Sequence, residues 1–225
     1  MSRIYNFSAG PAALPLEVLE TIRNDLPDWL GSGMSVMEVS HRGKDFVELA
    51  ARAEATLREL LNVPDDYSVL FPQGGATMQM AMAPLNLSGP GDTADYVVTG
   101  SWGKKAAGEA KKFCDVNVAA DASDRNFTYI PEESSWRRSE KAAYLHYTPN
   151  ETIAGVEFNF VPGGEVPLVA DMSSNILSRT IDVSRFGVIY AGAQKNIGPA
   201  GITLVIVRNE LLERARPGNA HLMTW

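Results

Sequence analysis

Residues 67–85 read YSVLFPQGGATMQMAMAPL, and within this stretch the chain changes from one type of structure to another. Residues 67–71 form an apolar run of strand length, Gly74-Gly75 indicates a turn, and residues 76–85 indicate a helix. A strand that leads through a short turn into a helix is the repeating unit of an α/β fold. This stretch therefore predicts the fold class.

The same alternation continues on both sides of this stretch. Short strands are predicted at residues 95–99, 116–119, 143–147, 167–171, 188–191 and 201–207. Helices are predicted at residues 16–26, 44–61, 103–113 and 209–216. Residues 123–140 are the most polar region and are expected to cross the surface as a loop. We expect an α/β fold with a mostly parallel sheet and helices on both of its faces.

Length and composition exclude several classes of protein. The 225 residues correspond to about one and a half domains, and a chain of this size buries enough surface to need no metal or disulfide. The net charge of −7 argues against a broad nucleic-acid surface. Cys114 is the only cysteine, which excludes an internal disulfide and a multi-cysteine zinc site and suits a reducing compartment.

Targeting and membrane signals are also missing from the sequence as given. The first residues contain no apolar core of signal-peptide length, and the longest strongly apolar stretch, residues 202–207, is too short to cross a bilayer. We therefore expect a cytoplasmic protein with neither a membrane nor a nucleic acid as partner. The spacing of its three histidines predicts no metal site.

Ligands of open α/β sheets collect at the carboxyl ends of the strands, so the residues that follow each strand are the candidates for chemistry. After the first strand, the helix that begins near Ala76 and Thr77 offers free N–H groups to an anion, although an ordinary turn capped by Thr77 is the simpler alternative. After the second strand, Trp102 offers a flat face to a planar ligand, or packs structurally. The sequence contains neither a G-x-G-x-x-G nor a P-loop motif.

Two later strand ends carry charged residues of opposite sign. Asp171 closes the apolar run 167–170, and a buried carboxylate there needs a partner, either a helix N-terminus or a cationic ligand atom. Lys195 lies 24 positions further on, within the small-residue stretch YAGAQKNIGPAG (190–201). Its side chain either extends to solvent or places a nucleophilic amine in a crowded pocket.

These features together match the chemical groups of one cofactor, pyridoxal phosphate. Its aldehyde reacts with lysine, its ring nitrogen pairs with a carboxylate, its ring is flat, and its phosphate is a dianion. Lys195, Asp171, Trp102 and the turn at residues 75–77 supply one complement to each.

The sequence also resembles a known family over nearly its whole length. The residues that carry this resemblance lie in separated motifs, at 6–11, 35–42, 150–153, 173–174, 178–179, 181–185 and 190–201. They are similar to those of the phosphoserine aminotransferases, a family in the class V branch of the fold-type I pyridoxal-phosphate enzymes. The large, cofactor-binding domain of that fold is thus expected here.

The resemblance implies a role for each candidate residue around the cofactor. Lys195 would bond covalently to the cofactor and act as the catalytic acid–base, Asp171 would keep the ring nitrogen protonated, and Trp102 would stack on the ring. Thr152 would bond the ring oxygen.

The resemblance further implies two anion sites. The backbone of Ala76 and Thr77, together with Gln194, would hold the cofactor phosphate. Some members carry Arg where this chain has Thr77, which weakens a side-chain contact there but leaves the backbone donors. His41 and Arg42, which would otherwise read as solvated surface, would receive the distal carboxylate or phosphate of the substrate.

The implied activity transfers the amino group of L-glutamate to 3-phosphohydroxypyruvate, in serine biosynthesis and, for a related phospho-substrate, in pyridoxine biosynthesis. A homodimer with sites at its interface is implied. Residues 1–15 would pack on a small C-terminal domain, and residues 16–225 would form an incomplete large domain, because family members continue beyond this sequence. The alternatives are a non-catalytic fragment that folds or holds cofactor, and another class V enzyme such as a serine–glyoxylate aminotransferase or a cysteine desulfurase, against which the His41-Arg42 pair argues.

Overall fold

The computed structural model describes residues 3–225, so the first two residues of the expected N-terminal segment, 1–15, lie outside the described part. Its main feature is a seven-stranded sheet in the order β1-β9-β8-β7-β4-β2-β3. The strands of this sheet are β1 (Tyr67–Leu70), β2 (Thr93–Val98), β3 (Asp115–Asp121), β4 (Ala142–Tyr147), β7 (Leu168–Asp171), β8 (Val188–Gly192) and β9 (Thr203–Arg208).

The strand directions agree with the expected mostly parallel sheet. β3, β2, β4, β7 and β8 are joined by parallel pairings, whereas β9 runs antiparallel to both β8 and β1. The carboxyl ends of β2, β4, β7 and β8 therefore meet at one edge of the sheet, where the sequence predicts the site.

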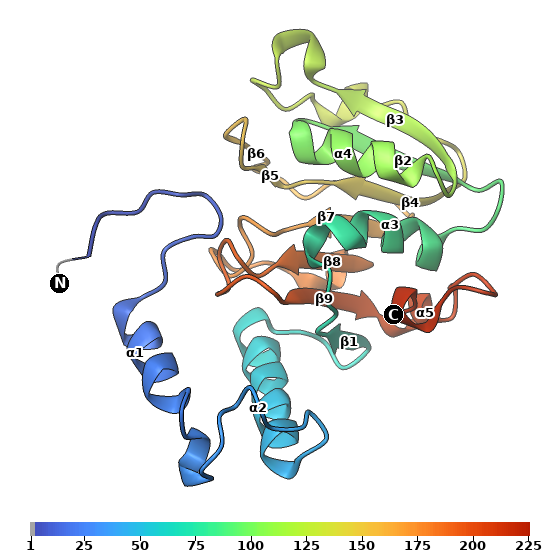
Figure 1. Ribbon diagram of the computed structural model, residues 1–225. Coiled ribbons are helices and arrows are strands. Elements are labelled where there is room, and N and C mark those ends of the chain that lie inside the picture. The colour runs from blue at the N-terminus through green and yellow to red at the C-terminus, as the bar shows by residue number, and fades with distance from the viewer. Residues whose placement is uncertain (1–2) are drawn as a thin grey trace.

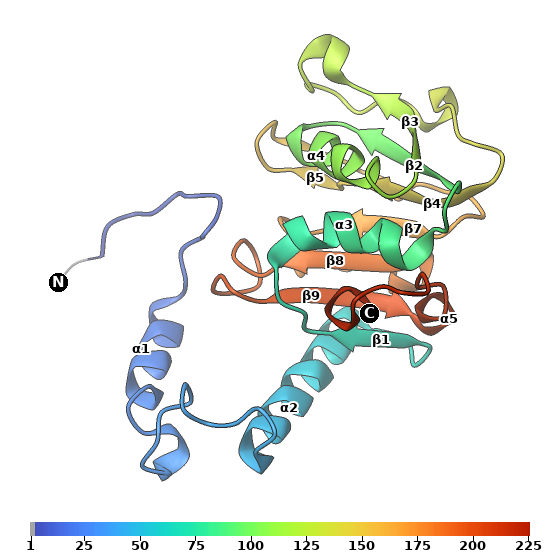
Figure 2. The ribbon, with the colours of Figure 1, turned by 45° about the vertical axis from the view of Figure 1, so that its right-hand side comes forward.

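Helices α3 (Gly75–Leu87) and α4 (Ser101–Ala110) cover one face of the sheet (Figures 1 and 2). The buried side of α4 consists of Gly103, Ala106, Ala107 and Ala110, and these small residues allow the helix to lie close to α3 and the strands. On the other face, Leu57 and Leu61 of α2 (Lys44–Leu61) join a cluster with Trp136, Phe158 and residues of the strands. The sheet thus has a hydrophobic core on each side.

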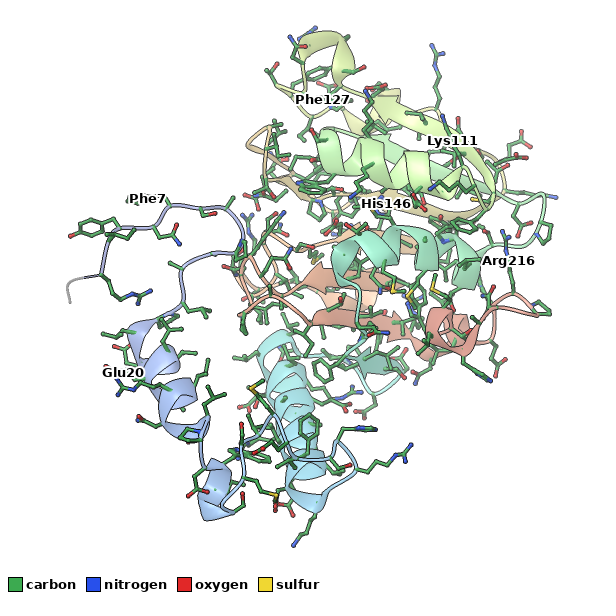
Figure 3. The ribbon with its side chains drawn as sticks, in the orientation of Figure 1. Phe7, Glu20, Lys111, Phe127, His146 and Arg216 are labelled. Carbon is green, nitrogen blue, oxygen red and sulfur yellow. The ribbon has the colours of Figure 1, made fainter. Side chains whose placement is uncertain are left out.

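The N-terminal part of the chain extends away from the sheet. Helix α1 (Leu16–Asp25) has no buried residue, and both views show it apart from the sheet (Figures 1 and 2). Tyr5 and Phe7 are each 92% exposed, and Phe7 projects from the extended segment into solvent (Figure 3). The segment is nevertheless joined to the sheet, because the amide of Ala12 donates a hydrogen bond of 2.8 Å to the carbonyl of Gln194.

Two local features differ from the sequence-based expectation. The helix expected over residues 209–216 forms only at α5 (Asn209–Leu212), because the backbone and guanidinium of Arg216 instead bond to carbonyls of the neighbouring chain segments, including those of Leu85 and Ser88. A small hairpin of β5 (Asn150–Glu151) and β6 (Val156–Glu157) was not expected. No helix among residues 3–225 has both the length and the apolar character needed to cross a membrane.

Candidate active site

A cavity of about 250 Å³ lies where the carboxyl ends of β7 and β8 meet the first turns of α3 and α4. All seven residues expected from the sequence to bind the cofactor line it. The lining consists of Ala9, Gly10, Gly75, Ala76, Thr77, Met80, Trp102, Thr152, Ile153, Asp171, Ser173, Gln194 and Lys195. Residues from separate parts of the chain therefore converge on one cavity.

Lys195 lies in the turn that follows β8, and its side chain points into this cavity. Its Nζ donates a hydrogen bond of 2.6 Å to the Thr152 hydroxyl and lies 4.9 Å from the centroid of the Trp102 ring. Burial lowers the pKa of Lys195 below its ordinary value, whereas the negative charges of Asp171 and Glu151 oppose that shift. An amine in such an environment is more readily deprotonated, and hence more nucleophilic, than a surface lysine.

Asp171 forms the buried end of β7 and is only 4% exposed. Its Oδ1 accepts hydrogen bonds from the hydroxyl and the amide of Ser173, at 2.6 and 3.1 Å, and the Ser173 hydroxyl also accepts one of 3.0 Å from the amide of Gly192. Burial raises the pKa of Asp171, while the bonds from Ser173 and the positive charge of Lys195 lower it. A cationic ligand atom in the cavity would favour the ionised carboxylate further.

The anion-binding end of the cavity is built by the first turn of α3. Gly74 and Gly75 have φ of +94° and +64°, a backbone conformation that favours glycine and turns the chain sharply into the helix. The first-turn amides of Ala76 and Thr77 have no partner within the helix and offer their N–H groups to a negative group. The amide of Ala76 and the side chain of Gln194 both lie beside Gly192, where a Cβ atom would be 3.4 and 2.8 Å from them.

His41 and Arg42 are not brought to this cavity. Both are exposed and belong to the loop before α2, whose N-terminal end lies away from the sheet in both views (Figures 1 and 2). Within residues 3–225, no group of three or more His, Cys, Asp or Glu side chains is arranged to hold a metal ion.

Sequence reasoning missed four polar residues around the cavity, namely Ser173, Glu151, Lys105 and Tyr190. Lys105 was detectable, because it lies three residues after Trp102 and thus on the same side of α4, where its Nζ donates a bond of 3.2 Å to the Thr77 hydroxyl. Tyr190 pairs in register with Asp171 on the neighbouring strand. Ser173 and Glu151 lie in stretches that carry the family resemblance, but their hydrogen bonds to Asp171, Gly192, Trp102 and Gly103 were not predicted.

The fold is that of a class of aminotransferases. Residues 4–220 match the family model described as Aminotransferase class-V. The chain therefore belongs to the class V aminotransferase family, and the expected fold class is confirmed.

The relatives within this family confirm the resemblance inferred from the sequence. The phosphoserine aminotransferase of Chromobacterium violaceum is 59% identical over 218 residues, which are 96% of this chain and 60% of the relative. That of Laribacter hongkongensis is 60% identical over 222 residues, 99% of this chain and 62% of the relative. The present chain thus spans about 60% of the length of these curated relatives.

Solved structures agree with the sequence relatives. The phosphoserine aminotransferase from Bacillus circulans subsp. alkalophilus superposes with a TM-score of 0.95 at 49% identity, over 99% of this chain and 62% of the other. The pyridoxal-phosphate-bound phosphoserine aminotransferase from Trichomonas vaginalis gives a TM-score of 0.93 at 46% identity, over 98% of this chain and 66% of the other.

Proposed function

We propose that this chain is the cofactor-binding part of a phosphoserine aminotransferase, which uses pyridoxal phosphate to transfer the amino group of L-glutamate to 3-phosphohydroxypyruvate. The products would be O-phospho-L-serine and 2-oxoglutarate. The observation that carries the proposal is the convergence of seven residues from separate segments on one cavity, with the Lys195 amine 2.6 Å from Thr152 and 4.9 Å from the Trp102 ring. The names of its relatives support the same activity.

The chemistry of the cavity fits this cofactor. It offers an amine to an aldehyde, a buried carboxylate to a ring nitrogen, an indole face to a flat ring, and helix amides to a phosphate. When bound, pyridoxal phosphate would supply an aldehyde that condenses with amines and a ring that withdraws electrons from the amino acid.

Lys195 would perform the covalent attachment and the proton transfer. Its Nζ already lies inside the cavity, and its lowered pKa makes the neutral amine accessible. Once displaced by the amino group of a substrate, the same Nζ would take the proton from the substrate Cα and deliver it to the carbon that carried the cofactor's aldehyde. Thr152 would orient this amine through the hydrogen bond that joins the two side chains.

Asp171 and Trp102 would determine how the ring is held. The Asp171 carboxylate, fixed by Ser173, would favour a protonated ring nitrogen, and each pKa unit of such bias is worth about 1.4 kcal/mol. The indole of Trp102 would form a flat wall of the cavity. The amides of Ala76 and Thr77, with Gln194, would bind the phosphate.

A homodimer would explain how His41 and Arg42 take part. Because both are exposed and outside the cavity, we propose that they receive the distal anion of the substrate in the cavity of a second copy of the chain. We also propose that the N-terminal segment, with Tyr5 and Phe7 exposed, packs on a C-terminal domain of the full-length protein. The single cysteine supports a cytoplasmic location.

The two half-reactions provide a direct test in the full-length protein. Glutamate alone should convert the bound cofactor to its amine form, seen as a change in its absorption, and 3-phosphohydroxypyruvate should reverse the change and yield O-phosphoserine. If serine and glyoxylate produce faster conversion, the chain serves another class V activity. If residues 1–225 alone bind the cofactor and no amino donor changes its absorption, the non-catalytic alternative is correct for this chain.

A further inference from the structure

Glu151 is a buried carboxylate that lies behind the cavity wall, bonded to Trp102 and next to Thr152, which both line the cavity. It is 0% exposed, and its two oxygens accept hydrogen bonds from the backbone at the start of α4, at 3.0 Å from the amide of Trp102 and 2.7 Å from the amide of Gly103. Burial raises its pKa, whereas these two bonds and the positive charge of Lys195 oppose the rise. The positive end of the α4 dipole also favours a negative charge at this point.

The sequence around Trp102 leaves the space that this carboxylate needs. A Cβ atom at Gly100 would lie 2.6 Å from Cγ of Glu151, and one at Gly103 would lie 3.2 Å from its Oε1. Both positions flank Trp102. The two glycines of the Gly-Ser-Trp-Gly stretch therefore leave room for the side chain of Glu151, which lies about fifty positions later in the chain.

Glu151 connects two parts of the proposed cofactor site. On one side it holds the backbone of Trp102, whose ring faces the Lys195 amine. On the other side it directly precedes Thr152, whose hydroxyl accepts the bond from that amine. A change in its position would therefore move the ring wall and the Thr152 hydroxyl relative to each other.

We propose that Glu151 is a positioning residue of the cofactor site, whose carboxylate fixes the ring plane of Trp102 relative to Thr152 and Lys195. This inference rests on the proposed function, because the group that Trp102 and Thr152 would orient is the bound cofactor. The charged and titratable groups around this wall are Lys195, Asp171 and Tyr190, with the Lys105 amine 5.7 Å from the Trp102 ring centroid.

The test uses the full-length protein loaded with pyridoxal phosphate and compares Glu151→Gln with wild type. The glutamine has almost the same volume but carries no charge, and its NH₂ group cannot accept the bond that one oxygen accepts now. We expect the Kd of the cofactor to rise by about tenfold or more. We also expect the circular dichroism of the bound cofactor, which reports its orientation, to change. The absorption of the bound cofactor changes with pH, and the midpoint of this change should lie at a lower pH, because a negative charge near Lys195 is lost.

Asp95→Asn is the matched control, because Asp95 is also buried, at 1% exposed, and also accepts backbone and side-chain hydrogen bonds. Its partners are Asn117 and Ser139, outside the cavity. Asp95→Asn should lower the stability of the protein yet leave the cofactor Kd, dichroism and pH midpoint unchanged. Glu151→Asp, which keeps the charge but shortens the side chain, should change the Kd and the dichroism while leaving the pH midpoint near that of wild type.

The outcomes separate this inference from the proposed function. A wild-type protein that binds no pyridoxal phosphate would contradict the proposed function itself. A wild type that binds the cofactor, with Glu151→Gln indistinguishable from Asp95→Asn in all three cofactor readouts, would overturn the positioning role alone. If Glu151→Gln does not fold, a cofactor Kd and dichroism in Glu151→Asp that equal those of wild type would also overturn the positioning role.

Discussion

His146 lies in the middle of the sheet, 1% exposed, with its Nε2 2.9 Å from the Tyr190 hydroxyl and its ring stacked on Tyr96. Burial lowers the pKa of this histidine from 6.5 to about 3, because the imidazolium would lose its hydration without gaining a charged partner. The neutral ring is therefore part of the folded structure.

This burial predicts a loss of stability in acid. The unfolded chain takes up the His146 proton below pH 6.5 and the folded chain does not until about pH 3, so the free energy of unfolding falls as the pH falls within that window. The contribution is about 1.4 kcal/mol per pH unit. Urea unfolding at pH 7 and pH 5 should show a shallower pH dependence of the free energy of unfolding in His146→Leu than in wild type. Equal pH dependence in His146→Leu and wild type would contradict the assignment.

Individual site residues were predictable from the sequence where a charge follows an apolar strand. Lys195 and Asp171 fulfil that condition, and both line the cavity. Glu151 and Ser173 do not. The Glu151 carboxylate accepts bonds from backbone amides of α4, and the Ser173 hydroxyl joins Asp171 to the amide of Gly192, so both depend on how β5, β7, β8 and α4 are packed. His41 and Arg42 were predicted from family resemblance alone, and this chain does not bring them to its own cavity.

Among the helices that border the cavity, one glycine stabilises the start of α3, whereas another lowers the stability of α4. Gly74 caps the start of α3 with φ +94°, and a Cβ atom there would lie 2.6 Å from Cβ of Met78. Gly108 lies in α4 at an exposed position, with no atom within 4 Å of a built Cβ. The first glycine is required by the turn, and the second only lowers the stability of its helix.

Alanine at these two positions should therefore change stability in opposite directions. Gly108→Ala should raise the free energy of unfolding by about 0.5–1 kcal/mol, because alanine loses less conformational entropy in a helix. Gly74→Ala should lower it by at least about 1 kcal/mol, through the unfavourable φ and the collision with Met78. Urea denaturation of both variants gives the comparison. Stabilisation by Gly74→Ala would mean that the turn into α3 has another conformation.

A helix or strand could be predicted from the sequence when the residues that determine it are neighbours in the chain. The helix expected at residues 44–61 has the same bounds as α2, because its apolar spacing is a local signal. The β5–β6 hairpin has only two residues per strand and so no detectable pattern. Trp136 is buried although residues 123–140 are polar, since its indole N–H reaches the carbonyl of Pro131 and its ring packs on Phe158.

At the scale of the whole molecule, the exposed residues suggest where further protein contacts lie. Helix α1 buries none of its residues, and Ile4, Tyr5 and Phe7 are exposed on the segment before it. An apolar surface of this kind is typical of contact with another domain or subunit. The position of His41 and Arg42 outside the cavity is consistent with the proposed dimer.

The dimer predicts that two defective copies complement each other. Arg42→Ala should retain bound cofactor but weaken substrate binding by about 1.5–3 kcal/mol, and Lys195→Ala should be inactive. Refolded together, half of the dimers would be mixed, and each would contain one complete site, so about one quarter of the wild-type activity should return. Activity no higher than that of the two variants measured separately would show that Arg42 does not serve the partner's cavity.

We propose that the Lys195 amine holds the cofactor covalently, and chemical trapping of that linkage tests the proposal. Borohydride reduction of the protein loaded with pyridoxal phosphate fixes the linkage, and peptide mapping by mass spectrometry then locates the modified residue. We predict the label on Lys195, whose amine points into the cavity, and its loss in Lys195→Ala. A label on Lys105 or any other lysine, or no reducible linkage in a cofactor-loaded protein, would contradict the assignment of Lys195.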